Sequence, residues 1–442
     1  LEQGFLTENI LIIKPGSQPI DGCKCYESVA ALPRQLDVLV VCLDAANTPD
    51  VLTLVAEHDK AKSVILIAGG LESDPQRLEQ INQSLAAQKF VINGGNCLGI
   101  RSVPANFHSF FIPTSKLPLP RSGKQNLAII SQSGAFSIVR MNKMEGLNPK
   151  YNISAGNQLD LTVGDYLDYL ADDSGLKAIG VYLEGFIAQD GTKTKQAISR
   201  FVTKGGKVIV YKAGQTAAGR SAVQGHTASL AGDYQTLVEL LSRVGALVSN
   251  SFEEFQDLLM LSSFWADFDT SDAELFGISN AGFECAAMGD HLGQVSLVEL
   301  DADSKSDLQA ILHKYRLDTL VQVANPLDLT PMAADSCWQE VLQALDNIKQ
   351  VGMVLASIVP FTHMMQTLPN ERKQAQKDHW LPEYLAQHPM QKPVCICVDA
   401  GVGYDSYRND FLQNGYPVFD SVDRACRALD RYQSYQNYLS RL

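Results

Sequence analysis

Short, continuous runs of apolar residues recur along the chain, and this pattern constrains the fold more than any other feature. Four such runs come early, at residues 9–13, 38–42, 63–68 and 89–93. Continuous apolar runs are typical of strands that are buried on both faces, as in parallel sheets. Amphipathic stretches such as residues 74–88 lie between them. The alternation therefore predicts βαβ units.

A proline-rich segment interrupts this alternation. The stretch "FFIPTSKLPLPRSGKQN", residues 110–126, combines prolines with polar residues and predicts a linker. Further strand-like runs follow at residues 127–131, 177–184, 207–214, 275–282, 352–360 and 393–401. Helical patterns occupy residues 134–144, 160–170 and 234–244. We therefore predict an α/β fold of three doubly wound domains, at residues 1–120, 121–270 and 271–442.

The overall charge limits the class of partner. With 49 acidic and 36 basic side chains, the chain has a formal net charge of −13. It has no basic stripe to neutralise phosphates, which argues against a nucleic-acid partner. A small anion can still bind, because backbone N–H groups at a helix start act locally.

Cysteine spacing and the length of the apolar runs bear on metal binding and on location. The nine cysteines form no C-x-x-C pair, so we expect reduced, structural thiols and no metal site. Reduced thiols are typical of a cytoplasmic protein, which is the location we expect. No apolar run reaches the ~18 residues of a membrane span, so we expect no membrane partner.

Two turns have the small residues of an anion-binding helix start. In "IISQSGAFS" and "ISNAGFECAAM" an apolar strand runs into a short polar turn and then into a helical pattern. Backbone N–H groups there can hold a phosphate, although an ordinary capped helix fits the same residues. Glu284, in the first turn of the second helix, can satisfy an N–H group instead. The candidate phosphate-binding residues are Ser131, Ser133, Gly134, Asn280, Ala281 and Gly282.

One histidine, His226, lies among small residues in "SAVQGHTASLAG". We expect residues 215–227 to form a glycine- and alanine-rich loop that leaves the imidazole unpacked. With an unperturbed pKa of about 6.5, the ring offers a neutral nitrogen nucleophile at pH 7. Glu184 closes an apolar strand and is the candidate carboxylate that fixes the ring tautomer. A structural surface histidine and a solvated strand-end glutamate are the simpler alternatives.

Seven motifs, read in order, carry a specific resemblance that covers nearly the whole chain. They are "GGNCLGI", "AIISQSGAFS", "NISAGNQLDLTVGDYLDYLADD", "YLEGF", "KAGQTAAGRSAVQGHTASLAGD", "ISNAGFE" and "ANPLDLT". The sequence resembles the NDP-forming acyl-CoA synthetase superfamily, which includes ADP-forming acetyl-CoA synthetase and succinyl-CoA synthetase. The pattern is most similar to the alpha subunit of the ADP-forming enzymes. It implies a Rossmann-like CoA-binding domain followed by two flavodoxin-like domains.

The resemblance assigns roles to individual residues. The phosphohistidine of the family falls on His226, and its partner glutamate falls on Glu184. The two helices that stabilise the phosphate start at the two turns described above. The motif that lines the CoA site falls on Gly94, Gly95, Asn96 and Cys97, and a second CoA-facing turn falls on Ala68, Gly69 and Gly70.

Two departures from the family pattern affect the expected cofactors and partners. Gly95 stands where the family has proline, which makes that turn more flexible. The first strand and glycine-rich turn of the CoA domain have no counterpart, so we expect missing N-terminal residues or weak CoA binding. The resemblance also implies ATP-grasp domains that bind ADP or ATP with Mg²⁺. We expect them on a partner beta subunit or on a longer parent chain, in a homo- or hetero-oligomer.

The implied reaction interconverts acyl-CoA, ADP and phosphate with a carboxylic acid, CoA and ATP, through an acyl phosphate and a phosphohistidine. The acyl group and the choice between ADP and GDP stay open. A catalytically silent, CoA-sensing regulatory module of the same family is the main alternative. An NAD-type oxidoreductase is a poor alternative, because no intact G-x-G-x-x-G follows a strand.

Overall fold

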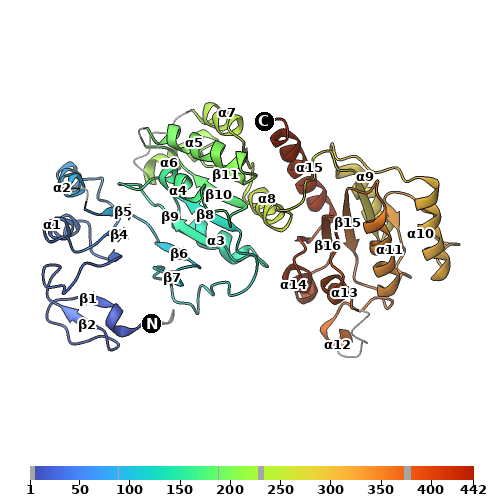
Figure 1. Cartoon of the computed structure of the whole chain (residues 1–442), viewed down its shortest axis with the longest axis horizontal. Coiled ribbons are helices and arrows are strands. Elements are labelled where there is room, and N and C mark those ends of the chain that lie inside the picture. The colour runs from blue at the N-terminus through green and yellow to red at the C-terminus, as the bar shows by residue number, and fades with distance from the viewer. Residues whose placement is uncertain (1–4, 88, 188, 227–232, 373–379) are drawn as a thin grey trace. The chain divides into compact units, whose positions relative to one another are not determined.

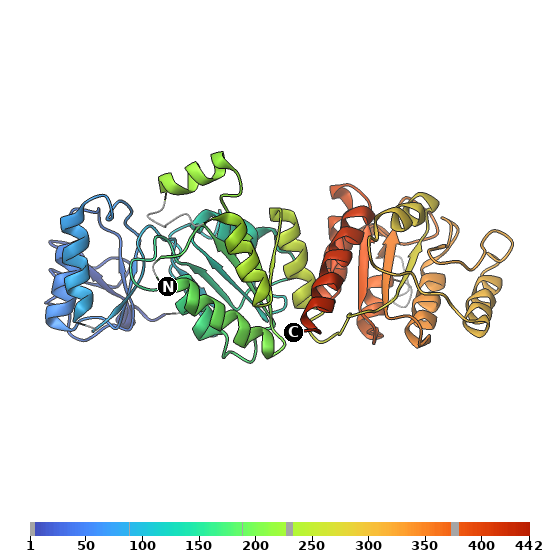
Figure 2. The same cartoon turned by 90° about the horizontal axis from the view of Figure 1, so that it is seen from above.

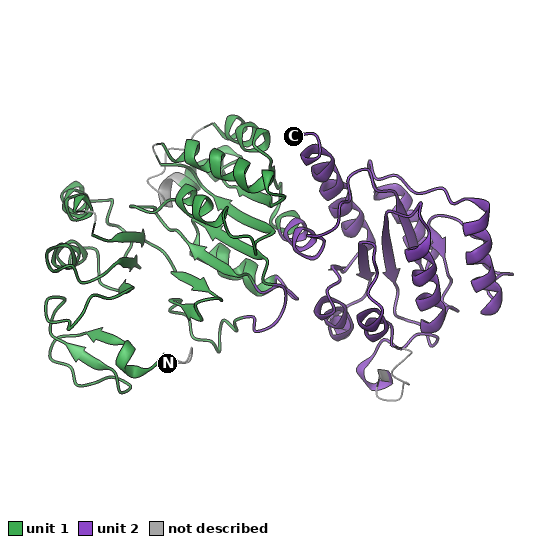
Figure 3. Cartoon of the chain, in the orientation of Figure 1, with its two compact units in different colours: residues 1–119, 125–143, 149–255 green, residues 120–124, 144–148, 256–442 purple. Residues whose placement is uncertain are grey.

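The computed structural model describes residues 5–87, 89–187, 189–226, 233–372 and 380–442. The chain divides into two compact units (Figure 3). Unit 1 comprises Leu1–Leu119, Gln125–Lys143 and Pro149–Phe255. Unit 2 comprises Pro120–Lys124, Met144–Asn148 and Gln256–Leu442.

The first part of unit 1 is a small parallel α/β layer (Figure 1). Its elements are the 3₁₀ turn Thr7–Asn9, β1 (Leu11–Ile13), β2 (Lys24–Tyr26), β3 (Leu39–Val41), α1 (Thr48–His58), β4 (Ser63–Leu66), α2 (Pro75–Ala86) and β5 (Val91–Gly94). β1 pairs with β2, and β3, β4 and β5 form a separate parallel sheet in that order. The buried strand residues Val64, Leu66 and Ile92 pack against apolar residues of α1 and α2, so both helices close this core.

A seven-stranded sheet forms the rest of unit 1. Its elements are β6 (Ile100–Ser102), β7 (Phe107–His108), β8 (Leu127–Ser131), α3 (Gly134–Lys143), β9 (Tyr151–Ser154), α4 (Val163–Leu170), β10 (Ala178–Leu183), α5 (Asp190–Thr203), β11 (Lys207–Lys212), α6 (Ala217–His226), α7 (Tyr234–Arg243), β12 (Ala246–Val248) and the start of α8 (Phe252–Phe264). The strand order is β12-β11-β10-β8-β9-β6-β7. The five parallel strands, numbered along the chain from β8, have the 2-1-3-4-5 order of flavodoxin-like folds. β6 extends the sheet by pairing antiparallel with β9.

Unit 2 repeats the same strand order in a five-stranded parallel sheet. Its elements are β13 (Leu275–Ser279), α9 (Gly282–His291), α10 (Ala302–Lys314), β14 (Leu327–Asp328), α11 (Asp335–Asn347), β15 (Met353–Ile358), α12 (Pro369–Arg372), α13 (Leu381–Gln387), β16 (Val394–Val398), the 3₁₀ turn Val402–Tyr404, α14 (Asp405–Gln413), β17 (Val418–Phe419) and α15 (Val422–Leu439). The order β14-β13-β15-β16-β17 is again 2-1-3-4-5. α9 and α15 pack together on one face of the sheet, and α10, α11 and α13 cover the other (Figures 1 and 2).

The predicted α/β fold, with a Rossmann-like sheet and two flavodoxin-like sheets, is confirmed. Burial on both faces holds for β8, where every residue is buried, but not for β1 and β3, which are only partly buried. The predicted linker, residues 110–126, contains no helix or strand. The predicted domain boundaries stay predictions, and β6 and β7, which precede residue 120, belong to the seven-stranded sheet.

The loop predicted before His226 is wrong, because Ala217–His226 is the helix α6. Its first turn contains Ala217 and Ala218, and alanine has the highest helix propensity. The hydroxyl of Thr216 accepts a hydrogen bond from the N–H of Gly219 at 3.1 Å, as an N-cap residue does. Helix propensity and this cap therefore outweigh the two glycines of the segment.

Two sequence expectations concern the whole chain. All nine cysteines are free thiols, and most of them are buried. Within the described residues, no helix combines the length and the apolar character needed to cross a bilayer.

Candidate functional site

The strand order of unit 1 reverses between β8 and β10, and such switch points are where open α/β sheets bind ligands. β10 pairs with β8 on one side and with β11 on the other. Tyr182 lies opposite Ser131, and Leu183 lies opposite Lys212. The carboxyl ends of the three strands therefore meet at one edge. Ser131, Glu184 and Lys212 all lie at that edge.

The turn between β8 and α3 is held by its own serines. The Ser131 hydroxyl donates to the carbonyl of Ser133 at 2.6 Å and accepts from the Ser133 N–H at 3.1 Å. The Ser133 hydroxyl accepts from the N–H of Phe136 at 3.3 Å, so Ser133 caps the helix. The N–H groups of Gly134 and Ala135 fall in the first turn, where an α-helix offers them no carbonyl. α3 has no acidic residue in that turn, so its start can accept an anion.

Gln132 connects this turn to the end of β10. Its Oε1 accepts from the N–H groups of Glu184 and of Gly185, the latter at 3.1 Å. Its Nε2 donates to the Gly185 carbonyl at 3.0 Å. The side chain of Gln132 therefore fixes the backbone that carries Glu184. Sequence reasoning quoted Gln132 within a motif but gave it no role.

The side chains of Glu184 and Lys212 are both buried beside this turn. Glu184 is 9% exposed and Lys212 is 7% exposed. The Lys212 ammonium donates to the Glu184 carbonyl at 2.8 Å and to the Ala213 carbonyl. Burial lowers the pKa of Lys212 to about 8, although the nearby Glu184 carboxylate opposes this shift. Burial, together with the charge and hydrogen bond of Glu184, raises the pKa of Tyr182. The sequence offered one signal for Lys212, a lysine that closes an apolar strand.

An aromatic layer lies between α3 and the strands. The Phe136 ring centroid is 4.3 Å from that of Tyr182 and 6.2 Å from that of Tyr211. The ring centroids of Phe252 and Phe255, in α8, lie 5.3 and 5.4 Å from that of Phe136. These rings pack α3 against β10, β11 and α8.

His226 is the last residue of α6. Its side chain, and residues 227–232, lie outside what the structure describes. The role of His226 therefore stays a prediction, and so does the pairing of its ring with Glu184.

The predicted CoA-facing turns lie at the carboxyl ends of β4 and β5. They require small residues, because a Cβ on Gly95 would lie 2.6 Å from the Ala68 carbonyl oxygen. A Cβ on Gly69 would lie 3.3 Å from the side chain of Asn96. Gly70 has a positive φ and nothing within 4 Å of a Cβ position, so the edge is open there. The backbone of these glycine turns is tightly packed at Gly69 and Gly95 and accessible at Gly70. Such a turn suits the phosphates of a nucleotide-like ligand.

Cys97 differs from the other residues of this turn. Its thiol is buried and contacts the amide of Asn93 at 3.3 Å and the Leu66 carbonyl at 3.3 Å. Burial raises the pKa of Cys97 to about 12. The buried thiol of Cys97 therefore packs the turn.

The end of β9 and the loop after it contact both the glycine turn after β5 and the start of α3. The hydroxyl of Ser154, the last residue of β9, accepts from the N–H of Leu98 at 3.0 Å, and in the loop the Asn157 N–H donates to the Gly95 carbonyl at 2.8 Å. A Cβ on Gly134 would lie 2.8 Å from the Cβ of Leu98 and 3.2 Å from the Ser154 hydroxyl. The structure therefore brings the predicted CoA turn and the first predicted phosphate helix into direct contact.

The second predicted phosphate turn lies in unit 2 and uses its side chains differently. The Asn280 amide bonds the Val359 backbone in both directions, at 2.9 and 2.8 Å. Ala281, at the N-cap position of α9, offers no side-chain cap. A Cβ on Gly282 would lie 3.1 Å from an Asp328 carboxylate oxygen. Only backbone groups of this turn are available for a phosphate.

Glu284 does not satisfy an N–H group at the start of α9, which corrects the alternative raised from the sequence. Its carboxylate instead accepts from the hydroxyl of Ser279. Burial raises the pKa of Glu284, and the nearby Asp399 adds to this shift. The reason is geometric, because the first turn of α9 points the side chain down onto the ends of the strands.

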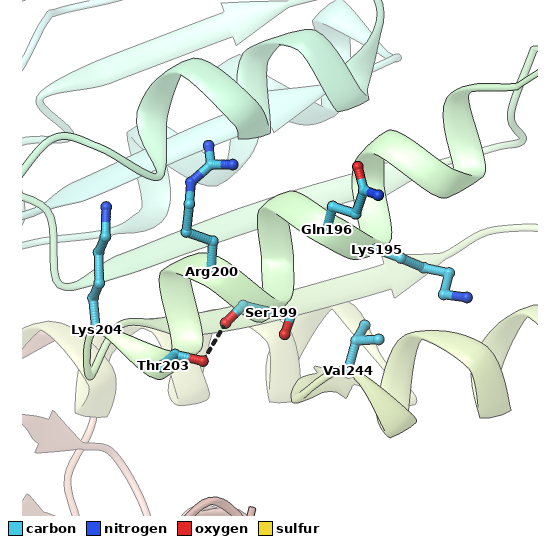
Figure 4. Close-up of a pocket in the computed structure, with 7 residues that line it drawn as sticks. All are labelled: Lys195, Gln196, Ser199, Arg200, Thr203, Lys204 and Val244. Carbon is cyan, nitrogen blue, oxygen red and sulfur yellow. Dashed lines mark hydrogen bonds between the residues drawn. The ribbon is translucent and has the colours of Figure 1, made fainter.

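A surface pocket of about 510 Å³ lies away from these residues, on α5 (Figure 4). It is lined by Lys195, Gln196, Ser199, Arg200, Thr203, Lys204 and Val244. Arg200 pairs with Asp168 at 3.0 Å, and Lys204 pairs with Asp172 at 2.6 Å. No predicted site residue lines it. In the part of the chain that is described, no three histidine, cysteine or acidic side chains are grouped closely enough to hold a metal ion.

Comparison with known proteins now bears on this geometry. Residues 124–262 match the succinyl-CoA ligase like flavodoxin domain family, and residues 4–102 match the CoA binding domain family. The chain is 27% identical over 93% of its length to the alpha subunit of ADP-forming acetate–CoA ligase II of Pyrococcus furiosus, and it covers 86% of that protein. The chain therefore carries a CoA binding domain followed by a succinyl-CoA ligase like flavodoxin domain, and it is similar over most of its length to an ADP-forming acetate–CoA ligase alpha subunit.

Two further proteins extend the comparison. A trans-feruloyl-CoA synthase from an unknown prokaryotic organism is 27% identical over 98% of this chain, which spans 60% of the length of that relative. A solved structure of the dinucleotide forming acetyl-coenzyme A synthetase 1 of Ca. Korarchaeum cryptofilum, in complex with phosphate and ADP, matches with a TM-score of 0.83 at 23% identity. The match covers 98% of this chain and 90% of that one, which confirms the fold.

The candidate site residues of unit 1 lie inside the two matched ranges. Ser131, Glu184, Lys212 and His226 fall within the residues that match the succinyl-CoA ligase like flavodoxin domain. The glycine turns after β4 and β5 fall within the residues that match the CoA binding domain.

Proposed function

We propose that this chain is the alpha-type portion of an NDP-forming acyl-CoA synthetase. Such an enzyme interconverts acyl-CoA, ADP and phosphate with a carboxylic acid, CoA and ATP. One observation carries the proposal. The open start of α3, the buried carboxylate of Glu184 and the buried ammonium of Lys212 lie at one switch point. The end of β9 and the loop after it contact both this switch point and the segment that follows β5.

In the first step, inorganic phosphate attacks the thioester carbon of acyl-CoA. The new bond joins a phosphate oxygen to the acyl carbon, the C–S bond breaks, and CoA leaves as the thiol with a proton from phosphate. Gly69, Gly70, Gly94 and Asn96 would hold CoA at the edge of the small sheet. The N–H groups of Gly134 and Ala135, with the dipole of α3, would hold the phosphate.

In the second step, an imidazole nitrogen of His226 attacks the phosphorus of the acyl phosphate. The P–O bond to the acyl group breaks, and the carboxylate leaves. Glu184 would accept the other ring N–H, which fixes the tautomer and makes the attacking nitrogen more basic. The work of the site is positioning and electrostatic stabilisation.

In the third step, the phosphohistidine passes its phosphoryl group to ADP on ATP-grasp domains of a beta subunit or of the parent chain. A β-phosphate oxygen of ADP attacks, and the N–P bond breaks. The start of α9, with Asn280, Ala281 and Gly282, is the second phosphate-binding element that we propose. Mg²⁺ would arrive with the nucleotide, and we assign it no ligand in this chain.

The acyl group is proposed only as a class. The relatives are named for feruloyl-CoA and for acetate, so the superfamily accepts carboxylic acids of very different size. A panel of acyl-CoA thioesters from acetyl to feruloyl would therefore define the substrate.

The experiment that tests this function is to incubate the chain, together with its ATP-grasp partner, with radiolabelled ATP and Mg²⁺. We expect acid-labile, base-stable label on the protein, and no label in His226→Ala. Label that persists in His226→Ala would refute the assignment. A thermal shift with CoA, but no label on the protein, would indicate the regulatory module instead.

A further inference from the structure

Lys212 is the last residue of β11, and its ammonium lies between the ends of two strands. It donates to the carbonyl of Glu184, which follows β10, at 2.8 Å, and to the carbonyl of Ala213, which follows β11. The ammonium nitrogen also lies 5.9 Å from the ring centroid of Tyr234, at the start of α7. Lys212 therefore joins two adjacent strand ends through their backbone carbonyls, one of which belongs to Glu184.

None of the ion pairs found among the described residues includes Lys212, but the Glu184 carboxylate acts on its ammonium through space. The groups that face Lys212 are Glu184, which follows β10, Tyr234 from α7 and, across Gly214, Arg220 from α6. Burying an ammonium with only carbonyl acceptors is unfavourable, so the fold retains it against a free-energy cost.

The fold itself does not require a lysine at this position. The pairing register shows which positions of the two sheets are equivalent. Tyr182 lies opposite Ser131 in unit 1, and Ser357 lies opposite Ser279 in unit 2. One residue further along, Leu183 lies opposite Lys212 and Ile358 lies opposite Val398, so Val398 is the equivalent of Lys212. An equivalent flavodoxin-like sheet therefore ends this strand with a buried valine.

We propose that Lys212 is a positioning residue for Glu184, which its positive charge keeps ionised and correctly oriented for the histidine that receives the phosphoryl group. This inference rests on the proposed function. The ammonium fixes the backbone at Glu184 and favours its carboxylate form. It also offsets the negative charge that a phosphoryl group brings to this edge of the sheet.

The test uses potassium phosphoramidate, a small phosphoryl donor that transfers to imidazole nitrogen and releases ammonia, so no nucleotide is needed. The protein that is labelled is the full chain, tested as wild type and as the variants Lys212→Met and Lys212→Arg. At pH 7 we expect Lys212→Met to label His226 about 10- to 100-fold more slowly than wild type. Lys212→Arg keeps the charge and should stay close to the wild-type rate.

The pH profile separates positioning from a structural role. Because burial lowers the pKa of Lys212 to about 8, wild type loses the charge as the pH rises through 8. The ratio of the wild-type rate to the Lys212→Met rate should therefore fall toward one above that pH. The ratio of wild type to Lys212→Arg should fall as well, since arginine stays charged. Titration of the donor cancels in both ratios.

Lys207→Met is the matched control, because Lys207 is also buried but begins β11, at the opposite end of the strand. We expect it to label at the wild-type rate. The inference is overturned if the ratio of wild type to Lys212→Met does not change with pH, or if Lys207→Met slows labelling equally. If wild type is labelled but not at His226, the proposed function fails, and this inference fails with it. If Lys212→Met does not fold, Lys212→Arg still tests the pH profile.

Discussion

Ser131-Gln132-Ser133-Gly134 in unit 1 and Ser279-Asn280-Ala281-Gly282 in unit 2 follow the first strands of two sheets with the same strand order. In both turns the hydroxyl of the first serine accepts a hydrogen bond, at 3.1 Å, from the backbone N–H of the residue two positions later in the sequence. In both, the next amide side chain bonds the backbone beyond the neighbouring strand. The common geometry is therefore a property of the strand–turn–helix connection.

The side chains around the two turns differ sharply. By the pairing register, the position of Glu184 in unit 1 is occupied by Val359 in unit 2, and the position of Lys212 is occupied by Val398. In the first helical turn, unit 1 has Phe136, whereas unit 2 has the buried carboxyl of Glu284. The fold accounts for the turn, but not for the buried charges of unit 1. Those charges are the best indication of chemistry in the chain.

The largest effect should come from Glu184→Gln, which removes the carboxylate but keeps its shape. We expect phosphorylation of His226 from acyl-CoA and phosphate to slow by about 10- to 100-fold, because glutamine does not hold the ring tautomer as firmly. The rate is measured by rapid quench with labelled phosphate. Val359→Ala, at the equivalent position of unit 2, should leave the rate unchanged. Equal loss in both variants would break the comparison.

The glycines that begin the two helices should respond differently to alanine. In Gly134→Ala the new Cβ would lie 2.8 Å from the Cβ of Leu98, so one segment must move. We expect a loss of about 1–3 kcal/mol of stability, typical of overpacking, and weaker CoA binding. In Gly282→Ala the contact is 3.1 Å from an Asp328 oxygen, which can rotate away. Urea unfolding midpoints and CoA titration would measure both variants, and equal losses would contradict this account.

A pH effect should arise from the carboxyl of Glu284 in unit 2. Burial raises the pKa of Glu284 above its ordinary value. In the pH window between the ordinary pKa and the raised pKa, the folded state holds a proton that the unfolded state has lost. The contribution of Glu284 to stability therefore falls as the pH rises through the window. Glu284→Gln has no such titration, so we expect it to gain stability relative to wild type from acid to neutral pH. Unfolding midpoints at several pH values would measure this, and parallel pH profiles would contradict it.

The smallest effect concerns the helix caps. Ser133→Ala gives α3 the same N-cap residue as α9, and we expect it to cost about 1 kcal/mol. Ala281→Ser is the reciprocal change and should stabilise unit 2 by a comparable or smaller amount. Chemical unfolding of both variants would check the pair. No change in Ser133→Ala would mean that the hydroxyl contact to Phe136 adds nothing to stability.

Much of the fold could be predicted because a fully buried parallel strand appears in the sequence as a continuous run of apolar residues, which is the mark by which strands are identified. The run at residues 127–131 became β8 without a shift, since all of its residues are buried. β6 and β7 left no such mark, because they are short and only partly apolar. The helix α6 was missed because its glycines and small residues also suit a loop.

The candidate site was predicted in part for a similar reason. Glu184 could be identified because a carboxylate at the end of an apolar strand is unusual. Lys212 closes an apolar strand in the same way, but its contact with Glu184, like the contacts of Gln132, depends on which strands are neighbours in the assembled sheet. His226 was singled out by its small neighbours, and the resemblance supplied its role.

The central claim is that His226 in unit 1 receives a phosphoryl group from an acyl phosphate. The most direct measurement is to incubate the chain with acetyl-CoA or feruloyl-CoA and radiolabelled inorganic phosphate, then map acid-labile label by peptide analysis. The account predicts label at His226 together with released CoA, and no protein label in His226→Gln, which can still release CoA in the first step. Label at another residue, label that survives in His226→Gln, or an unlabelled wild type with both thioesters would contradict it.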